Sequence, residues 1–150
     1  TKVLQVMGLR EIERWVNVLL LQDLAEHKPK ELIRLSLVRS KFGELIAANS
    51  IFHERRHEIA LMCLFSVLDA MLDLPMEEAL MDLPISDDIR EMLVYRTGNL
   101  LPIHTIIKCY EKGECTDIFK ISDQIKLKVE YLGILYVEAI RWADGIMRAL

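Results

Sequence analysis

Residues 58–72 read EIALMCLFSVLDAML, and this stretch decides the fold. Its apolar side chains surround a helix on nearly every side, which is typical of a central helix packed against several neighbours. The longest uncharged run within it, Ile59 to Leu68, has ten residues before Asp69 interrupts it. Because about 20 apolar residues are needed to cross a bilayer, we expect a buried core helix and no membrane span.

Amphipathic helices are predicted on the N-terminal side of this stretch. Apolar residues recur every three or four positions through residues 9–24, and the same spacing returns after Pro29, which stands at a first-turn position. We expect this second helix to expose Lys30, Glu31, Arg34 and Lys41 and to bury one apolar face, made of Leu32, Leu35, Val38, Phe42, Leu45 and Ile46.

Turn and capping residues divide the C-terminal half into further helices. A short helix is predicted over 77–81, a second after Ser86, and a third over 100–110, which Gly113 stops. Ser122 is expected to cap the last and longest helix, residues 122–150. Since no repeat and no linker divides the chain, we predict one all-α domain of about eight helices over residues 1–150.

Composition narrows the class of protein. Of 150 residues, 52% are apolar and only ten are glycine or proline, which excludes a disordered or fibrous chain. The net charge of −4 comes without a basic stripe, so nucleic acid is not expected as a partner. Three cysteines, Cys63, Cys109 and Cys115, argue against a disulfide framework and are typical of a reducing cytoplasm. The chain start has no signal-peptide pattern and lies inside an amphipathic segment, so we expect a cytoplasmic fragment of a longer protein.

One short motif points to an enzyme. His53-Glu54-Arg55-Arg56-His57 matches H-E-x-x-H, in which two histidines one helical turn apart bind zinc and the glutamate activates a water. Glu77, 20 residues later, is a candidate third ligand. Two arginines inside the motif would repel a dication, and the polar stretch before it indicates a solvated connection. A metal-dependent hydrolase therefore remains the alternative to a module without metal or cofactor.

Two further ionisable residues lie among apolar ones. We interpret Asp69 as a helix edge that reaches solvent, or as the ion-pair partner of Arg34 or Arg39. We interpret His104, among Pro102, Ile103 and Ile106, as a core or boundary histidine rather than a pH switch.

Several stretches taken in order resemble a known family. They are LIRLSLVR at 32–39, LFSVLDAML at 64–72 with PMEE at 75–78, and YEKGE at 110–114, accompanied by MGLR at 7–10 and LPIS at 83–86. Their order and spacing resemble the HDOD domain, the HD-related output domain of bacterial signalling proteins, in the form found behind an EAL domain. The resemblance runs from the first residues to about Glu114 and leaves residues 122–150 as a C-terminal helical extension.

The resemblance implies an HD-like helical fold without the HD metal site. HD phosphohydrolases hold metal with a histidine on one helix and a His-Asp dyad on a later one. The resemblance places Leu35 at the first position, and Ser66 and Val67 at the dyad. Leucine and valine cannot bind a metal, and one serine hydroxyl replaces imidazole poorly. A whole HDOD domain would also have helices before Thr1, and their absence would leave apolar surface for another copy or a neighbouring domain.

We therefore expect a non-catalytic signal-transduction module that acts through protein partners or a neighbouring EAL domain, with a homodimer as one possibility. By the resemblance, hydrolysis of cyclic di-GMP would belong to the EAL domain. The alternatives are a hydrolase that uses His53, Glu54, His57 and Glu77, a residual HD phosphohydrolase, and a regulatory site for a small ligand.

Overall fold

A computed structural model describes residues 29–149, and every structural statement below concerns this part of the chain. The helix predicted over 9–24 lies outside it. The described residues form α-helices, short 3-10 helices (η) and connecting turns, which confirms the all-α prediction. The elements in chain order are α3 (Lys30–Ala48), η1 (His53–Arg55), α4 (Arg56–Leu64), η2 (Phe65–Val67), α5 (Leu68–Leu72), α6 (Met76–Ala79), α7 (Asp87–Tyr95), α8 (Leu101–Lys112), α9 (Ile118–Gln124), η3 (Val129–Tyr131) and α10 (Leu132–Ala149). None of these helices combines the length and apolarity needed to cross a membrane.

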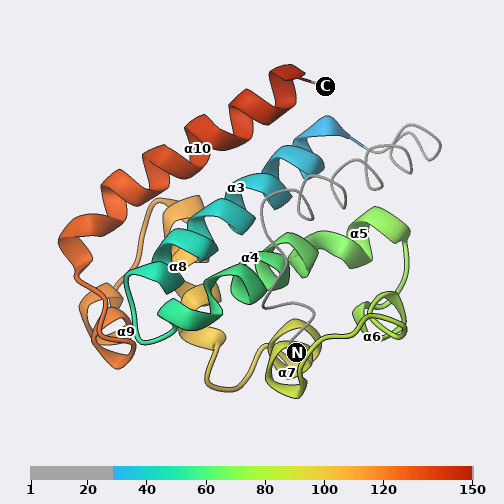
Figure 1. Ribbon diagram of the computed structural model, residues 1–150, viewed down its shortest axis with the longest axis horizontal. Coiled ribbons are helices and arrows are strands. Elements are labelled where there is room, and N and C mark those ends of the chain that lie inside the picture. Colours follow the sequence, from blue (N-terminus) through green and yellow to red (C-terminus); the bar gives the residue numbers. More distant parts are fainter. Residues whose placement is uncertain (1–28, 150) are drawn as a thin grey trace.

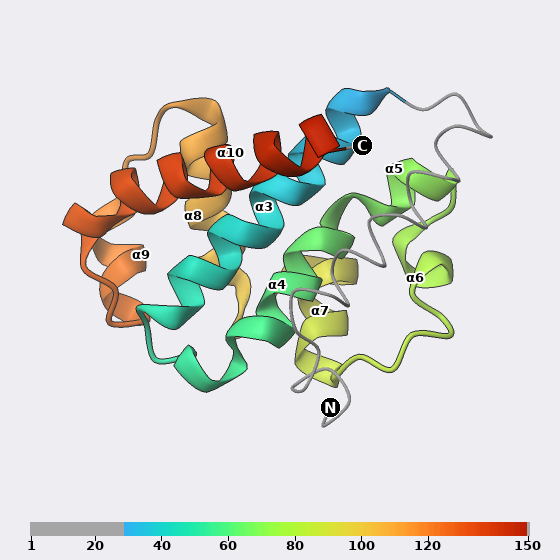
Figure 2. The same ribbon diagram turned by 45° about the horizontal axis from the view of Figure 1, so that its top comes forward.

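Helix α3 lies at the centre of this arrangement. It packs along α4 on one side and against α10 on the other, and α8 also contacts it (Figures 1 and 2). The prediction of a single apolar face on this helix is therefore wrong. Ser36, Arg39, Ser40 and Gly43 are buried as well, because neighbouring helices cover α3 on several sides.

The predicted central helix, residues 58–72, is buried from Glu58 to Leu68 but is not one continuous α-helix. The 3-10 turn η2 separates α4 from α5. Within it, the Ser66 hydroxyl donates a hydrogen bond of 2.6 Å to the carbonyl oxygen of Cys63. A serine that bonds back to the preceding turn competes with regular helix geometry, and this bond lies at the interruption.

Small residues allow α3 and α4 to approach closely. A side-chain carbon added to Gly43 would collide with the side chain of Cys63. One turn earlier, the Ser40 hydroxyl donates a 2.9 Å hydrogen bond to the carbonyl oxygen of Ala60. Glycine and serine are thus needed here for space, and the two helices hold the core between them.

Three aromatic rings join α3, α8 and α10. Phe42 lies 5.4 Å from Tyr110 and 5.0 Å from Tyr136, and the two tyrosine rings are 5.2 Å apart, measured between centroids. Such tilted and edge-to-face pairs add to the energy of burial. This cluster fixes α10 on the core.

The last helix begins later than predicted. Ser122 does not cap it but is buried within α9, and α10 starts at Leu132. Lys126 has a φ of 56°, a left-handed conformation that ends the helical path after α9. With 18 residues, α10 is also one residue shorter than α3.

Candidate functional site

A buried polar centre lies where α3, η2 and α8 meet. The Arg39 guanidinium donates two hydrogen bonds to the Glu111 carboxylate, 2.7 Å from Nε to Oε2 and 2.8 Å from Nη2 to Oε1. Its third nitrogen, Nη1, donates to the Ser66 hydroxyl at 3.1 Å. The side chains of Arg39 and Glu111 are only 8% and 16% exposed. A two-pronged pair of this kind fixes both the position and the orientation of the groups it joins.

Ser66 links this pair to a second arginine. Arg96, the left-handed residue that follows α7, donates a 3.4 Å hydrogen bond to the Ser66 carbonyl oxygen. Burial lowers the pKa of Arg96, as does repulsion from Arg39, while Asp69 acts in the opposite direction. Two guanidinium groups therefore converge on one serine, from helices that are far apart in the sequence.

Two nearby groups that could react are held in their neutral forms. Burial, assisted by the positive charges of Arg96, Arg39 and Lys108, lowers the pKa of His104 to about 3. Burial raises the pKa of the Cys63 thiol to about 12. At neutral pH the His104 imidazole and the Cys63 thiol are therefore both uncharged.

The positions that the resemblance assigns to an HD metal do not fit a metal ion. Leu35 is half-buried on α3, one turn before Arg39, and Val67 is buried beside Ser66. The Ser66 hydroxyl is already engaged with Arg39 and the Cys63 carbonyl. A guanidinium therefore occupies the side of Ser66 that faces α3, and a cation in contact with it would be repelled.

The residues of the H-E-x-x-H match do not assemble around a common point. His53 and Glu54 are exposed in η1, and Glu77 is exposed on α6. His57 lies in the first turn of α4, half-buried, with Nδ1 buried and without a hydrogen-bond partner. Between residues 29 and 149, no three residues of the types His, Cys, Asp and Glu lie close enough together to hold a metal.

Arg55, the first arginine of that motif, forms ion pairs with two carboxylates. Arg55 contacts Asp88 at 2.6 Å and Glu58 at 3.1 Å, and the Ser86 hydroxyl lies within hydrogen-bond distance of both carboxylates. The hydrogen bond from Arg55 is the main reason why the pKa of Asp88 falls to about 2. This cluster ties the start of α4 to the start of α7. Arg55 therefore has a structural role within a connection whose His53 and Glu54 are exposed.

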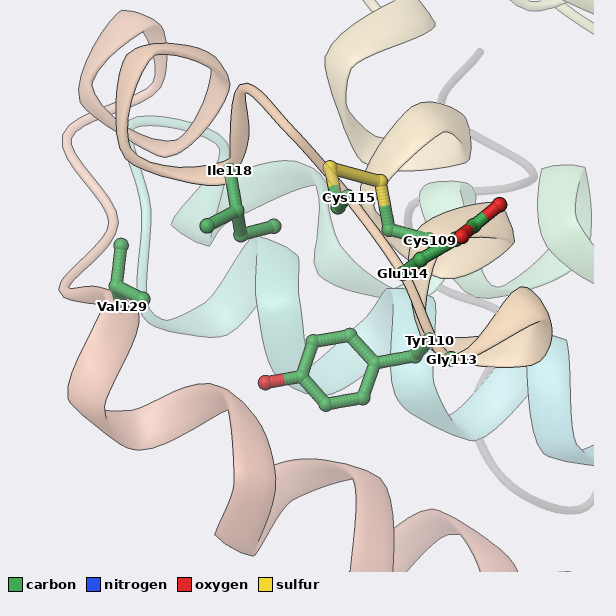
Figure 3. Close-up of a pocket in the computed structure, with 7 residues that line it drawn as sticks. All are labelled: Cys109, Tyr110, Gly113, Glu114, Cys115, Ile118 and Val129. Carbon is green, nitrogen blue, oxygen red and sulfur yellow. A yellow bond between two sulfur atoms is a disulfide. The ribbon is translucent and has the colours of Figure 1, made fainter.

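Cys109 and Cys115 are joined in a disulfide, whereas the cysteine count had argued against a disulfide framework. Gly113 ends α8 in a left-handed conformation, and this turn brings the two cysteines to a Cα–Cα distance of 5.0 Å. Figure 3 shows the disulfide at one side of a small surface pocket of about 260 Å³. The residues that line it are Cys109, Tyr110, Gly113, Glu114, Cys115, Ile118 and Val129.

The polar centre was not recognised from the sequence. Arg34 and Arg39, considered as partners of Asp69, instead pair with Asp144 and Glu111. Asp69 itself is half-buried. The available signal was an arginine inside the apolar segment 32–42, but its partner lies on α8, and helical spacing does not identify a residue so distant in sequence.

The whole chain is similar to one third of two longer bacterial proteins. It is 30% identical over 149 residues to "Cyclic di-GMP phosphodiesterase CdgJ" of Vibrio cholerae, covering 99% of this chain and 34% of that protein. It is 26% identical over 151 residues to "Uncharacterized protein YuxH" of Bacillus subtilis, covering 99% of this chain and 36% of that protein. No protein-family model and no solved structure matches the chain. The chain is therefore a distant homologue of these two proteins and spans about a third of the length of each.

Proposed function

We propose that this chain is a non-catalytic helical module of the HDOD type, which transmits signals through protein contacts in a protein linked to cyclic di-GMP. The observation that carries the proposal is the Arg39–Glu111 pair, hydrogen-bonded to Ser66. The pair contacts Ser66, one of the positions where the resemblance would put a metal ligand. The pair joins α3 to α8, and the loss of either member alone would leave a buried charge without its counterpart.

The similarity to CdgJ supports the link to cyclic di-GMP. That protein carries the name of a cyclic di-GMP phosphodiesterase, and this chain matches about a third of it. By the resemblance, hydrolysis belongs to an EAL domain, and the helical module acts on that domain or on a separate protein partner.

Metal content and hydrolysis test the non-catalytic role. We expect the 150-residue chain, purified without chelator, to contain no stoichiometric zinc, iron or manganese, and not to hydrolyse cyclic di-GMP or simple phosphodiesters when Mg²⁺ or Mn²⁺ is added. Stoichiometric metal that is lost in H53A or H57A, but kept in a matched H27A variant, would establish the hydrolase alternative instead.

A domain exchange tests the signalling role. The third of CdgJ that this chain matches is replaced by the chain itself, and hydrolysis of cyclic di-GMP is compared with that of intact CdgJ and of CdgJ lacking that third. We expect the exchanged protein to resemble intact CdgJ more closely than the truncated one. Equal rates for all three proteins would contradict a regulatory contribution of this module.

A further inference from the structure

Helix α10 has two faces of different character. Its inner face is held against α3 by the ion pair between Arg34 and Asp144 and by contact between the rings of Phe42 and Tyr136. Its outer face carries large apolar side chains in solvent, with Ile134 68% and Val137 46% exposed. Figures 1 and 2 show α10 at the edge of the molecule, with α3 on its inner side.

The outer face is a single stripe. Ile134, Val137, Glu138, Arg141 and Gly145 are all exposed and follow one another at helical spacings of one, three and four residues, which places them along one side of α10. Among the described residues, neither Glu138 nor Arg141 forms an ion pair. We call these five residues the α10 stripe.

The order of charges along the α10 stripe is self-complementary. If a second α10 lies antiparallel to the first, with a two-fold axis between Ala139 and Ile140, Glu138 of each copy faces Arg141 of the other. A two-fold interface of this kind repeats each contact twice, so one charge pair in the sequence gives two in the dimer. In a parallel pair, Glu138 would face Glu138, and like charges at such positions oppose that orientation.

The same arrangement accounts for a glycine that the protomer itself does not require. It places Ile134 of one copy opposite Gly145 of the other, so that a large apolar side chain meets the smallest residue. A side-chain carbon at Gly145 would contact nothing within 4 Å in the described structure, although glycine is among the least favourable residues inside a helix. Close approach of a second helix gives this glycine a packing role.

We propose that the α10 stripe is the contact surface of a homodimer, in which two copies of this chain pair antiparallel along α10. The contact is one helix wide and therefore smaller than a standard interface of about 800 Å² per partner, so we expect association in the micromolar range. The dimer extends the proposed interaction role, but its test requires no activity measurement, so failure of either proposal can be recognised separately.

Charge-reversal variants test this arrangement by sedimentation equilibrium over micromolar to millimolar protein concentration. E138R and R141E each place like charges opposite one another at both pairs, and we expect each to raise the dimer Kd at least tenfold. The double variant E138R/R141E restores opposite charges and should return to the wild-type Kd. An equimolar mixture of E138R and R141E should form a heterodimer, because every pair then has opposite signs.

Two controls separate this face from others. K120E changes an exposed charge on α9 and should leave the Kd unchanged, whereas I134S should weaken the dimer without changing any charge. Helix content by circular dichroism establishes that each variant is folded. A wild-type chain that stays monomeric, single variants that dimerise normally, or a mixture that does not associate would each overturn the proposal.

Discussion

Arg39 of α3 and Glu111 of α8, 72 positions apart in the sequence, form a two-pronged ion pair with distances of 2.7 and 2.8 Å. Arg39 also donates to Ser66, so one guanidinium joins α3, η2 and α8. The side chains of both partners are largely withdrawn from solvent. Loss of either Arg39 or Glu111 would therefore leave a buried charge without its partner.

Removal of one member of this pair should destabilise the fold strongly. We expect R39M or E111Q to lower the free energy of unfolding by about 3 kcal/mol, because the remaining partner stays buried without its counterpart. Urea denaturation measures this. The double variant R39M/E111L should recover most of the loss, and a double variant as unstable as the sum of the singles would show that the two residues do not act as a pair.

The contact between Gly43 and Cys63 gives a second prediction. G43A should lose about 1–3 kcal/mol of stability, because the added methyl group collides with the Cys63 side chain where α3 and α4 are closest. In a C63A background the same substitution should cost much less, since the obstructing sulfur is gone. Equal costs of G43A in both backgrounds, measured by urea denaturation, would contradict this contact.

Acid sensitivity should depend on His104. Burial and the positive charges around it lower its pKa to about 3, below the ordinary value of about 6.5. Between these two values the unfolded chain binds a proton that the folded chain does not. The contribution of His104 to the free energy of unfolding is therefore fully present above about pH 6.5, the ordinary pKa of histidine. It falls as the pH decreases from there toward about 3, by at most about 1.4 kcal/mol per pH unit.

The H104Q variant isolates this effect. We expect its unfolding free energy to depend less on pH between about 6.5 and about 3 than that of the wild type. H53Q, which changes the same residue type at an exposed position of η1, serves as the matched control and should follow the wild-type curve. Parallel curves for H104Q and the wild type would rule out a buried neutral histidine.

The disulfide between Cys109 and Cys115 predicts a redox dependence of stability. It closes a loop with a sequence separation of six residues, for which chain entropy gives a contribution of about 2 kcal/mol. Addition of a dithiol reductant should lower the free energy of unfolding of the wild type by about this amount. The C109S/C115S variant should not respond to the reductant, and a response of equal size in that variant would refute the assignment.

Part of this fold could be read from residues close together in the sequence. The apolar run at 58–72 indicated a buried helix, and Gly113 marked the end of α8, because helical periodicity and left-handed turns depend on local chemistry. The left-handed Lys126, which separates α9 from α10, has no such signature, so the predicted helix from Ser122 began ten residues too early.

By itself, the sequence determined that the chain is helical, that residues 58–68 are buried, and that leucine and valine at 35 and 67 cannot bind a metal. Tertiary structure alone decided that α3 is covered on several sides and that Arg39 pairs with Glu111. The physical reason is that the spacing of apolar residues along one helix shows only which of its faces must be buried. Which distant helix covers a given face, and which charge it brings, depends on how all the helices pack together.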